Sequence, residues 1–162
     1  MTDELRILHE CLPRVGDAHP RLQRRLARLL TACDRRGASV AEPRSCGIHR
    51  DFYPAQVLLD GARLWLIDFD LYCKGDPALD VGNFIGHVTE ESLRTLGDAE
   101  ALQDREIAME KRFVELTCES ARPAVQTYTA LTLARHVYLS TQFPERAPFT
   151  ERLLELCEER LL

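Results

Sequence analysis

Residues 46–87 read CGIHRDFYPAQVLLDGARLWLIDFDLYCKGDPALDVGNFIGH, and this stretch decides the fold. It predicts, in order, a short loop carrying Asp51, a tight hairpin, an acidic cluster at Asp68 and Asp70, and a capped helix. The flanking sequence predicts mainly helices. We therefore expect a mostly α architecture with one small β-hairpin embedded in it (an α+β fold), as a single domain over residues 1–162.

The hairpin signal comes from two short apolar runs at residues 57–59 and 64–67. Between them lies Asp60-Gly61, a dipeptide that favours the tight turns of β-hairpins. We expect residues 60–63 to form the turn.

Antiparallel pairing then brings polar side chains to one edge of the hairpin. With this turn, Val57 lies opposite approximately Ile67, and Gln56 opposite approximately Asp68. Asp51 is five residues before Gln56, in a loop that leaves from the same edge. We expect the oxygen-bearing side chains of these three polar residues to converge.

Such a set of oxygens suits a hard cation. Carboxylate and amide oxygens are ligands that Mg²⁺ prefers, and they leave positions for water and phosphate. An aspartate outside the metal shell can accept a proton from an attacking hydroxyl. Aspartate at a strand end is also a common turn former or helix cap, which is the structural alternative for either residue alone.

The flanking helices follow from apolar periodicity and from stop signals. Pro13 follows the first helix, Gly37 ends the second, Asp76 caps the third and Gly97 stops it. Residues 43–47 are expected to be loop. The helices are expected over residues 2–12, 22–33, 77–96, 99–120, 123–138 and 153–161.

Composition narrows the class of protein. The 162 residues are 45% hydrophobic and 29% charged, typical of a globular chain. No apolar run approaches the roughly 20 residues that span a bilayer, so no membrane association is expected. The basic segment 21–36 contains no aromatic residue and predicts a solvated helix face rather than a nucleic-acid groove. Six scattered cysteines without a C-x-x-C pair favour reduced thiols and a cytoplasmic protein.

At this point the residues resemble a known family. His49-Arg50-Asp51 followed by Gln56 resembles the kinase catalytic loop H-R-D-x-x-x-x-N, and residues 68–70 (DFD) stand where D-F-G would. The runs LIDFD at 66–70 and GDPALD at 75–80 are more similar to the small-molecule branch, the aminoglycoside phosphotransferase and choline kinase-like family. The resemblance covers residues 46–88, which would form the catalytic and metal-binding segment.

The resemblance implies a role for each matching residue. Asp51 would be the catalytic base for the acceptor hydroxyl, and His49 would orient the loop. Asp68 would hold Mg²⁺ against the phosphates of ATP. Gln56 stands at the asparagine position that supports a second metal ion, on a longer side chain. Asp70 replaces the glycine of D-F-G and would be a further metal or structural carboxylate.

Asp80 has two alternative roles. In the family it would brace the catalytic loop by accepting hydrogen bonds. Equally, it is a carboxylate in the first turn of a helix, where the helix dipole favours it.

The resemblance also implies a nucleotide-covering lobe with a glycine-rich loop and a strand lysine. Both lysines of this chain, Lys74 and Lys111, follow Asp51, and the glycines before Asp51 are isolated. We therefore expect a protein-kinase-like C-terminal lobe lacking its N-terminal nucleotide lobe. It would be a truncated chain or one completed by a partner chain, with weak Mg²⁺-ATP binding and little turnover alone.

The expected function is ATP-dependent phosphoryl transfer to a hydroxyl of a small molecule. One alternative is a non-catalytic remnant or binding module of the same fold, and another is metal-dependent hydrolysis. Acidic helices could steer a cationic substrate, although a solvated acidic face explains them more simply. These acidic residues are Glu90, Glu91, Asp98, Glu100, Asp104, Glu106 and Glu110.

Overall fold

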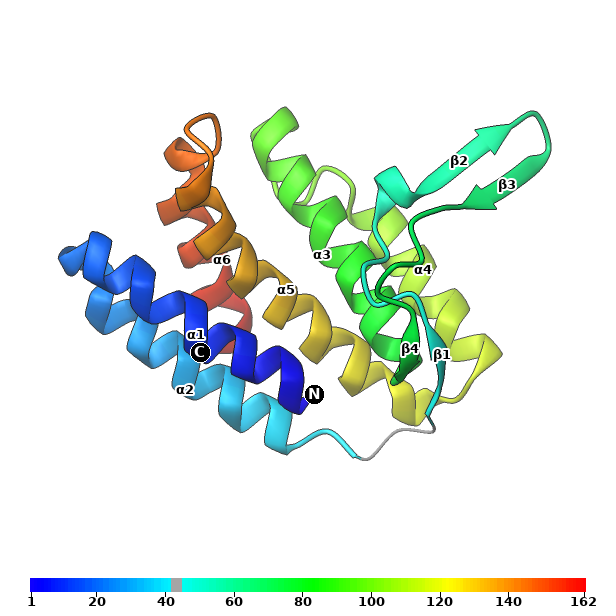
Figure 1. Cartoon of the computed structure of the whole chain (residues 1–162), viewed down its shortest axis with the longest axis horizontal. Coiled ribbons are helices and arrows are strands. Elements are labelled where there is room, and N and C mark those ends of the chain that lie inside the picture. The colour runs from blue at the N-terminus through cyan, green and yellow to red at the C-terminus, as the bar shows by residue number, and fades with distance from the viewer. Residues whose placement is uncertain (42–44) are drawn as a thin grey trace.

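The computed structural model describes residues 1–41 and 45–162, and most of these residues are helical (Figure 1). The helices are α1 (Thr2–Ala18), α2 (Gln23–Ala38), α3 (Pro77–Leu96), α4 (Gln103–Leu116), α5 (Arg122–Gln142) and α6 (Thr150–Leu161). Single 3-10 turns lie at Pro20–Leu22, Pro54–Gln56, Glu119–Ala121 and Ala147–Phe149. The strands are β1 (Cys46–Ile48), β2 (Val57–Asp60), β3 (Arg63–Leu66) and β4 (Cys73–Gly75). The mostly α, α+β prediction is confirmed.

Helix α5 is the centre of the helical body. It packs against α1, α2, α3 and α6, and α1 and α2 lie side by side as an antiparallel pair (Figure 1). Tyr128, Leu133 and Val137 of α5 are almost completely buried. Burying side chains of this size is the main stabilising contribution in a domain.

Two glycines set the distance between α3 and α5. A Cβ atom at Gly82 would lie 2.8 Å from the backbone nitrogen of Thr129, and one at Gly86 would lie 2.7 Å from Cγ2 of Thr132. Both distances are shorter than van der Waals contact, so only glycine permits this approach. Because α3 also carries residues that contact the loop before Asp51, the close packing fixes that loop relative to α5.

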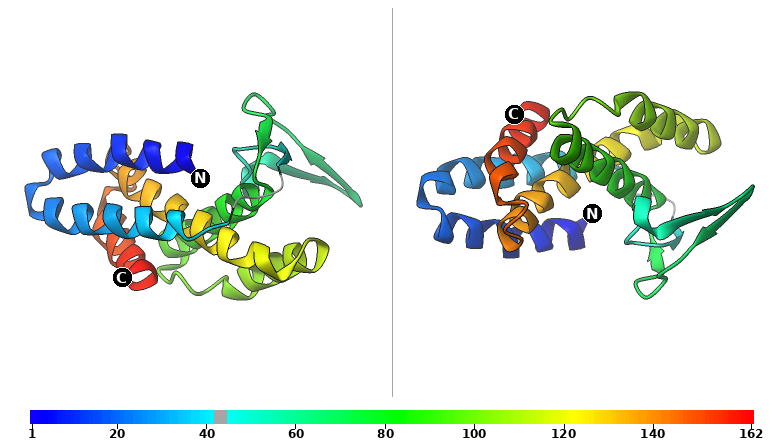
Figure 2. Two further views of the ribbon diagram at one scale, coloured as in Figure 1. Left: turned by 90° about the horizontal axis from the view of Figure 1, so that it is seen from below. Right: turned by 90° about the horizontal axis from the view of Figure 1, so that it is seen from above.

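The strands form two separate antiparallel sheets, β1 with β4 and β2 with β3. The hairpin of β2 and β3 projects away from the helices in all three views (Figures 1 and 2). Its apolar side chains and those that follow are largely exposed: Leu58, Leu59, Leu64, Trp65, Leu66, Ile67, Phe69, Leu71 and Tyr72.

The predicted boundaries of α3 are confirmed. The side chain of Asp76 accepts a hydrogen bond of 3.0 Å from the backbone N–H of Ala78, and Pro77 opens the helix. Gly97 ends it in a left-handed conformation with φ 74°. An aspartate cap, a proline at the first position and a glycine stop are local signals, and here they agree with the tertiary packing.

Several other predicted boundaries were wrong. Helix α1 continues through Pro13 to Ala18, because Val15 beyond the proline is buried in the core. Helix α2 contains Gly37 rather than ending before it, and the glycine lets Leu5 of α1 pack close by. Buried packing thus extended two helices past residues that usually stop one.

The predicted helix over 99–120 is also too long, because α4 spans only Gln103–Leu116. Asp98 begins a turn in which its carboxylate accepts from the N–H of Glu100, and Leu116 is 67% exposed rather than packed. The expected loop over 43–47 is wrong from Cys46 onward, where β1 begins. Residues 43 and 44 lie outside the described part of the chain.

Within the described residues, no helix combines the length and apolar character needed to cross a membrane. All six cysteines are free.

Candidate active site

The loop that carries Asp51 connects β1 to the 3-10 turn at residues 54–56. Contacts of its first residue, His49, hold it in place. His49 is buried, and its Nε2 lies 2.8 Å from the backbone carbonyl oxygen of Ile67. Since Ile67 immediately precedes Asp68, this contact ties the loop to the second acidic segment. The His49 ring also packs on Phe69, with ring centroids 4.8 Å apart.

Asp80 holds the same loop from α3. Its two carboxylate oxygens accept hydrogen bonds of 2.7 Å each from the backbone N–H groups of His49 and Arg50. Both alternatives for Asp80 are therefore correct, because it lies in the first turn of α3 and also braces the loop. Burial raises the pKa of Asp80 above the usual aspartate value, although the two backbone donors act in the opposite direction.

Two residues of the site hold strained backbone conformations. Arg50 has φ 70° and Asp68 has φ 64°, in the left-handed region that favours glycine. Arg50 directly precedes Asp51, so its conformation sets where the Asp51 side chain points. Its guanidinium lies 3.7 Å from Asp3 and 3.6 Å from Glu4, at the start of α1.

Gln56 and Asp68 meet as predicted. The side-chain Nε2 of Gln56 donates to Oδ2 of Asp68 over 3.1 Å, and Gln56 is buried whereas Asp68 is exposed. The expected register is wrong by one residue, since Val57 lies opposite Leu66. Only two residues lie between the paired ends of the strands, which puts Gln56 beside Ile67 in the backbone ladder. The long Gln56 side chain still reaches the next residue.

The other predicted residues lie nearby with fewer contacts. Asp51 is half-buried, and within the described residues no hydrogen bond or ion pair occupies its carboxylate. Asp70 is exposed and likewise forms no side-chain bond there. Direct contact is thus limited to Gln56 and Asp68, and the convergence of Asp51 with them stays a prediction.

The Mg²⁺ that the resemblance implies can be tested against these side chains. No group of three or more His, Cys, Asp and Glu residues in the described ranges is arranged to hold a metal ion by itself. Mg²⁺ in phosphoryl-transfer sites commonly binds one or two protein oxygens and takes the rest from phosphates and water. The exposed Asp68 carboxylate beside the Gln56 amide fits that requirement.

Asn83 and Arg135 belong to the site but were not predicted. Asn83 donates from Nδ2 to the carbonyl oxygen of Phe52 over 3.0 Å, and its Oδ1 accepts from Nη2 of Arg135 over 2.9 Å. Asn83 is buried and follows Asp80 by one helical turn. A polar residue on the apolar face of a helix was the signal available in the sequence.

An open cavity of about 580 Å³ lies beside Asp51. Residues of the Asp51 loop, α3 and α5 line it together with Arg146, which follows α5. Tyr53 stacks on His87 of α3 in its wall, with ring centroids 4.7 Å apart. The cavity is of the size that small-molecule ligands occupy.

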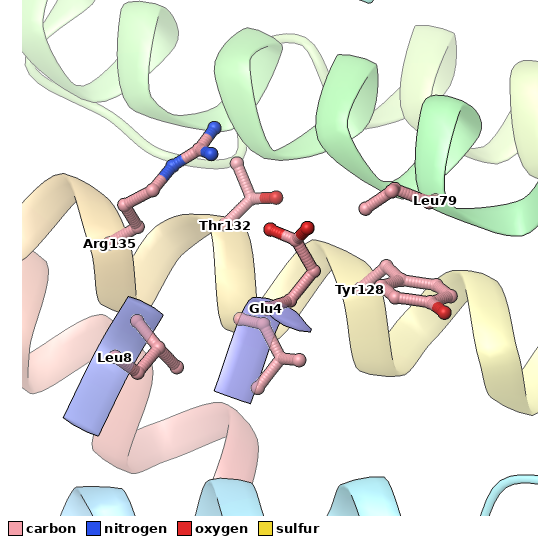
Figure 3. A pocket seen from close by; sticks show the side chains of 7 residues that line it. Glu4, Leu8, Leu79, Tyr128, Thr132 and Arg135 are labelled. Atoms are coloured by element: carbon pink, nitrogen blue, oxygen red, sulfur yellow. The ribbon is translucent and has the colours of Figure 1, made fainter. Parts of the chain in front are cut away.

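Two further cavities differ from it in volume and in lining residues. The one in Figure 3, between α1, α3 and α5, has a volume of only about 10 Å³, about enough for one water. Glu4 and Tyr128 contribute to it, and Arg135 reaches across it toward α3 (Figure 3). A groove of about 490 Å³ on α4, α5 and α6 is lined by several acidic residues, including Glu106.

Acidic residues considered for steering a cationic substrate line two separate cavities. Glu90 and Glu91 line the cavity beside Asp51, whereas Glu100, Glu106 and Glu110 line the groove on α4 to α6. Glu90 is buried and pairs with Arg94 over 3.1 Å.

Comparison with known proteins places these features in a family. No curated protein and no solved structure was found to match the chain. A family model described as "Phosphotransferase enzyme family" matches residues 2–114, well over half of the chain, including the Asp51 loop, the hairpin and α3. The chain belongs to this family of kinase-like phosphotransferases, which includes the aminoglycoside phosphotransferases.

Proposed function

We propose that this chain carries the catalytic lobe of an ATP-dependent kinase that phosphorylates a hydroxyl of a small molecule. The observation that carries the proposal is the Gln56–Asp68 contact of 3.1 Å at the edge of a loop whose backbone is held by Asp80. Membership of a phosphotransferase family supports the same reaction type.

Asp51 is the proposed base. Asp51 lines an open cavity, and its carboxylate is not engaged by other side chains in the described residues, so it can accept a hydrogen bond from an entering hydroxyl. In the proposed step the hydroxyl oxygen forms a bond to the γ-phosphorus of ATP, and its proton passes to Asp51. The bond from that phosphorus to the β–γ bridging oxygen breaks, and its electron pair leaves with ADP.

Asp68 and Gln56 are the proposed ligands for Mg²⁺, with Asp70 as a further candidate. When bound, Mg²⁺ would neutralise charge on the nucleotide phosphates. His49 is proposed as a positioning residue, because it is buried and connects the Asp51 loop to the residue before Asp68.

A second lobe or a partner chain is proposed to cover the nucleotide. The hairpin of β2 and β3 exposes apolar side chains, among them Trp65 at 54% and Leu59 at 77%. An isolated two-stranded hairpin with exposed apolar residues is marginally stable, so a covering layer would stabilise it. Without that layer, we expect weak Mg²⁺-ATP binding and little turnover.

The alternative is a non-catalytic remnant or binding module of the same fold. The observation in its favour is that no group of three or more His, Cys, Asp and Glu residues in the described ranges could hold a metal ion by itself.

Calorimetric titration with Mg²⁺-ATP separates the kinase lobe from a remnant that has lost the nucleotide site. The proposed kinase lobe binds Mg²⁺-ATP at millimolar concentration, and Asp68→Asn abolishes the heat signal. Asparagine tolerates the left-handed conformation, so this variant removes the charge with little backbone cost. Asp51→Asn should leave binding unchanged. No binding by the unaltered chain at millimolar nucleotide would support the remnant instead.

A further inference from the structure

The cavity beside Asp51 is lined by three carboxylates and three arginines, and two of these arginines have no acidic partner among the described residues. Three arginines line it, Arg94 and Arg135 from helices and Arg146 from the segment after α5. Only Arg94 has an acidic partner, because its Nε lies 3.1 Å from the buried Glu90 carboxylate. In the described residues, no carboxylate lies within 4.0 Å of the other two guanidinium groups.

Arg135 is held in place without being neutralised. Its Nη2 donates to the uncharged amide oxygen of Asn83 over 2.9 Å, and its Nε is buried with no partner among the described residues. A buried donor without an acceptor is costly, and a guanidinium increases that cost. Because Nε itself is closed off from solvent, an anion entering the cavity would accept hydrogen bonds from the Nη groups of this guanidinium.

Arg146 lines the same cavity, and an aromatic ring holds its side chain in place of a polar partner. Its guanidinium carbon lies 5.2 Å from the centre of the Phe143 ring, which orients the side chain without neutralising it. Because this support is apolar, the guanidinium keeps its hydrogen-bond donors for a ligand. Arg135 and Arg146 are therefore two guanidinium groups that line the cavity without a carboxylate partner among the described residues.

The two neighbouring histidines add no positive charge to the cavity near pH 7. His87 lines the cavity, and its ring contacts that of His136 at 4.5 Å. Burial and the charges of Arg135 and Arg146 lower the pKa of His87 to about 4, so it stays neutral near pH 7. His87 therefore contributes a neutral ring to the cavity lining.

We propose that the acceptor substrate carries an anionic group, a carboxylate or a phosphate, which Arg135 and Arg146 bind while the hydroxyl lies at Asp51. This inference rests on the proposed kinase function and deepens it. Arginine suits the role, because its planar set of N–H groups matches the oxygens of both anions. Glu91, also at the cavity, leaves the cationic substrate as the competing outcome.

Binding can be tested with the full chain in the absence of nucleotide. The probes are 3-hydroxypropanoate, inorganic phosphate and choline, followed by NMR of the arginine Nε–H signals. We expect the carboxylate, the phosphate or both to shift the signals of Arg135 and Arg146 saturably, and the two titrations identify which anion is preferred. Arg146→Gln should weaken that binding by about tenfold or more.

Two control variants test whether the effect on anion binding is specific to Arg146. Arg152→Gln removes an exposed arginine of α6 outside the cavity and should change nothing, whereas Arg146→Lys should retain part of the affinity. Binding of choline alone, or anion binding that Arg146→Gln leaves intact, would overturn the inference. Anion binding at Arg146 in a chain that never binds Mg²⁺-ATP would instead refute the kinase proposal and leave the anion site standing.

Discussion

Replacing Asp80 should release the loop that carries Asp51. In the wild-type chain its carboxylate accepts two backbone hydrogen bonds of 2.7 Å. Asp80→Asn keeps one acceptor oxygen and presents an N–H₂ group to the other backbone donor, so one buried N–H loses its partner. That loss costs about 1–3 kcal/mol of unfolding free energy. Asp80→Ala leaves both N–H groups without partners and should cost about 2–5 kcal/mol.

Urea unfolding measures the loss, and amide hydrogen exchange locates it. The N–H groups of His49 and Arg50 should lose protection in both Asp80 variants, while those of α5 keep theirs. Asp60→Asn, at the exposed hairpin turn, is the matched control and should change neither measurement. If Asp80→Ala unfolds at the wild-type urea concentration with both loop amides still protected, the loop is held by something else.

The same carboxylate has a pH signature. Because burial raises the pKa of Asp80 in the folded state, the folded chain retains its proton at a pH where the unfolded chain has lost it. Its contribution to stability therefore falls as pH rises through the window between the unfolded and folded pKa values. Asp80→Asn should remove this contribution from the measured pH dependence.

Three other substitutions or conditions test the remaining architecture. Gly82→Ala places a Cβ against the backbone of α5 and should cost about 2 kcal/mol or more in urea unfolding. In the control, Gly16→Ala, the Cβ would lie 3.3 Å from Cγ of the flexible Gln23 side chain and at an ordinary 3.5 Å from its Cα, so this variant should be neutral or stabilising. Arg50→Gly should be more stable than Arg50→Ala by about 1 kcal/mol, because both variants lose the same ion pairs but only glycine adopts a positive φ without strain. Equal stabilities of the two variants would contradict the left-handed conformation at this residue. Lowering the pH from 7 to 5 should remove about 2 kcal/mol of unfolding free energy for each of His87 and His136. In the unfolded chain both rings take up protons near pH 6.5, whereas burial lowers their pKa in the folded chain to about 4 and about 2, so the folded rings stay neutral. His136→Leu should halve that drop, and an unchanged drop would show that other groups cause it.

The elements predicted well were those with local causes. The two-residue turn after Asp60 and the cap at Asp76 act within a few residues, so short windows of sequence contain them. The meeting of Gln56 with Asp68 also followed from a single hairpin, and the side chain was long enough to tolerate a register error of one residue.

The elements predicted poorly depend on partners far along the chain. Strand β1 pairs with β4 across an intervening hairpin, so neither three-residue strand has a local signal. Pro13 lies inside α1 because packing further along the helix outweighs its usual effect. Arg135 reaches the site only because glycines bring α3 against α5, and no periodicity in one helix could indicate that.

The positive φ angles of Arg50 and Asp68 indicate whether the loop and the hairpin edge serve catalysis or only packing. In the described ranges, Arg50 and Asp68 are the non-glycine residues with positive φ, and each conformation costs of order 1–3 kcal/mol. Asp68 is exposed and Arg50 only half-buried, so neither conformation is forced by a dense core. Each is held by a specific polar contact, Arg50 by Asp80 and Asp68 by Gln56. Their shared consequence is to orient Asp51 and Asp68. Since these contacts are present in both the kinase and the remnant alternatives, the measurement that divides the alternatives is binding of Mg²⁺-ATP.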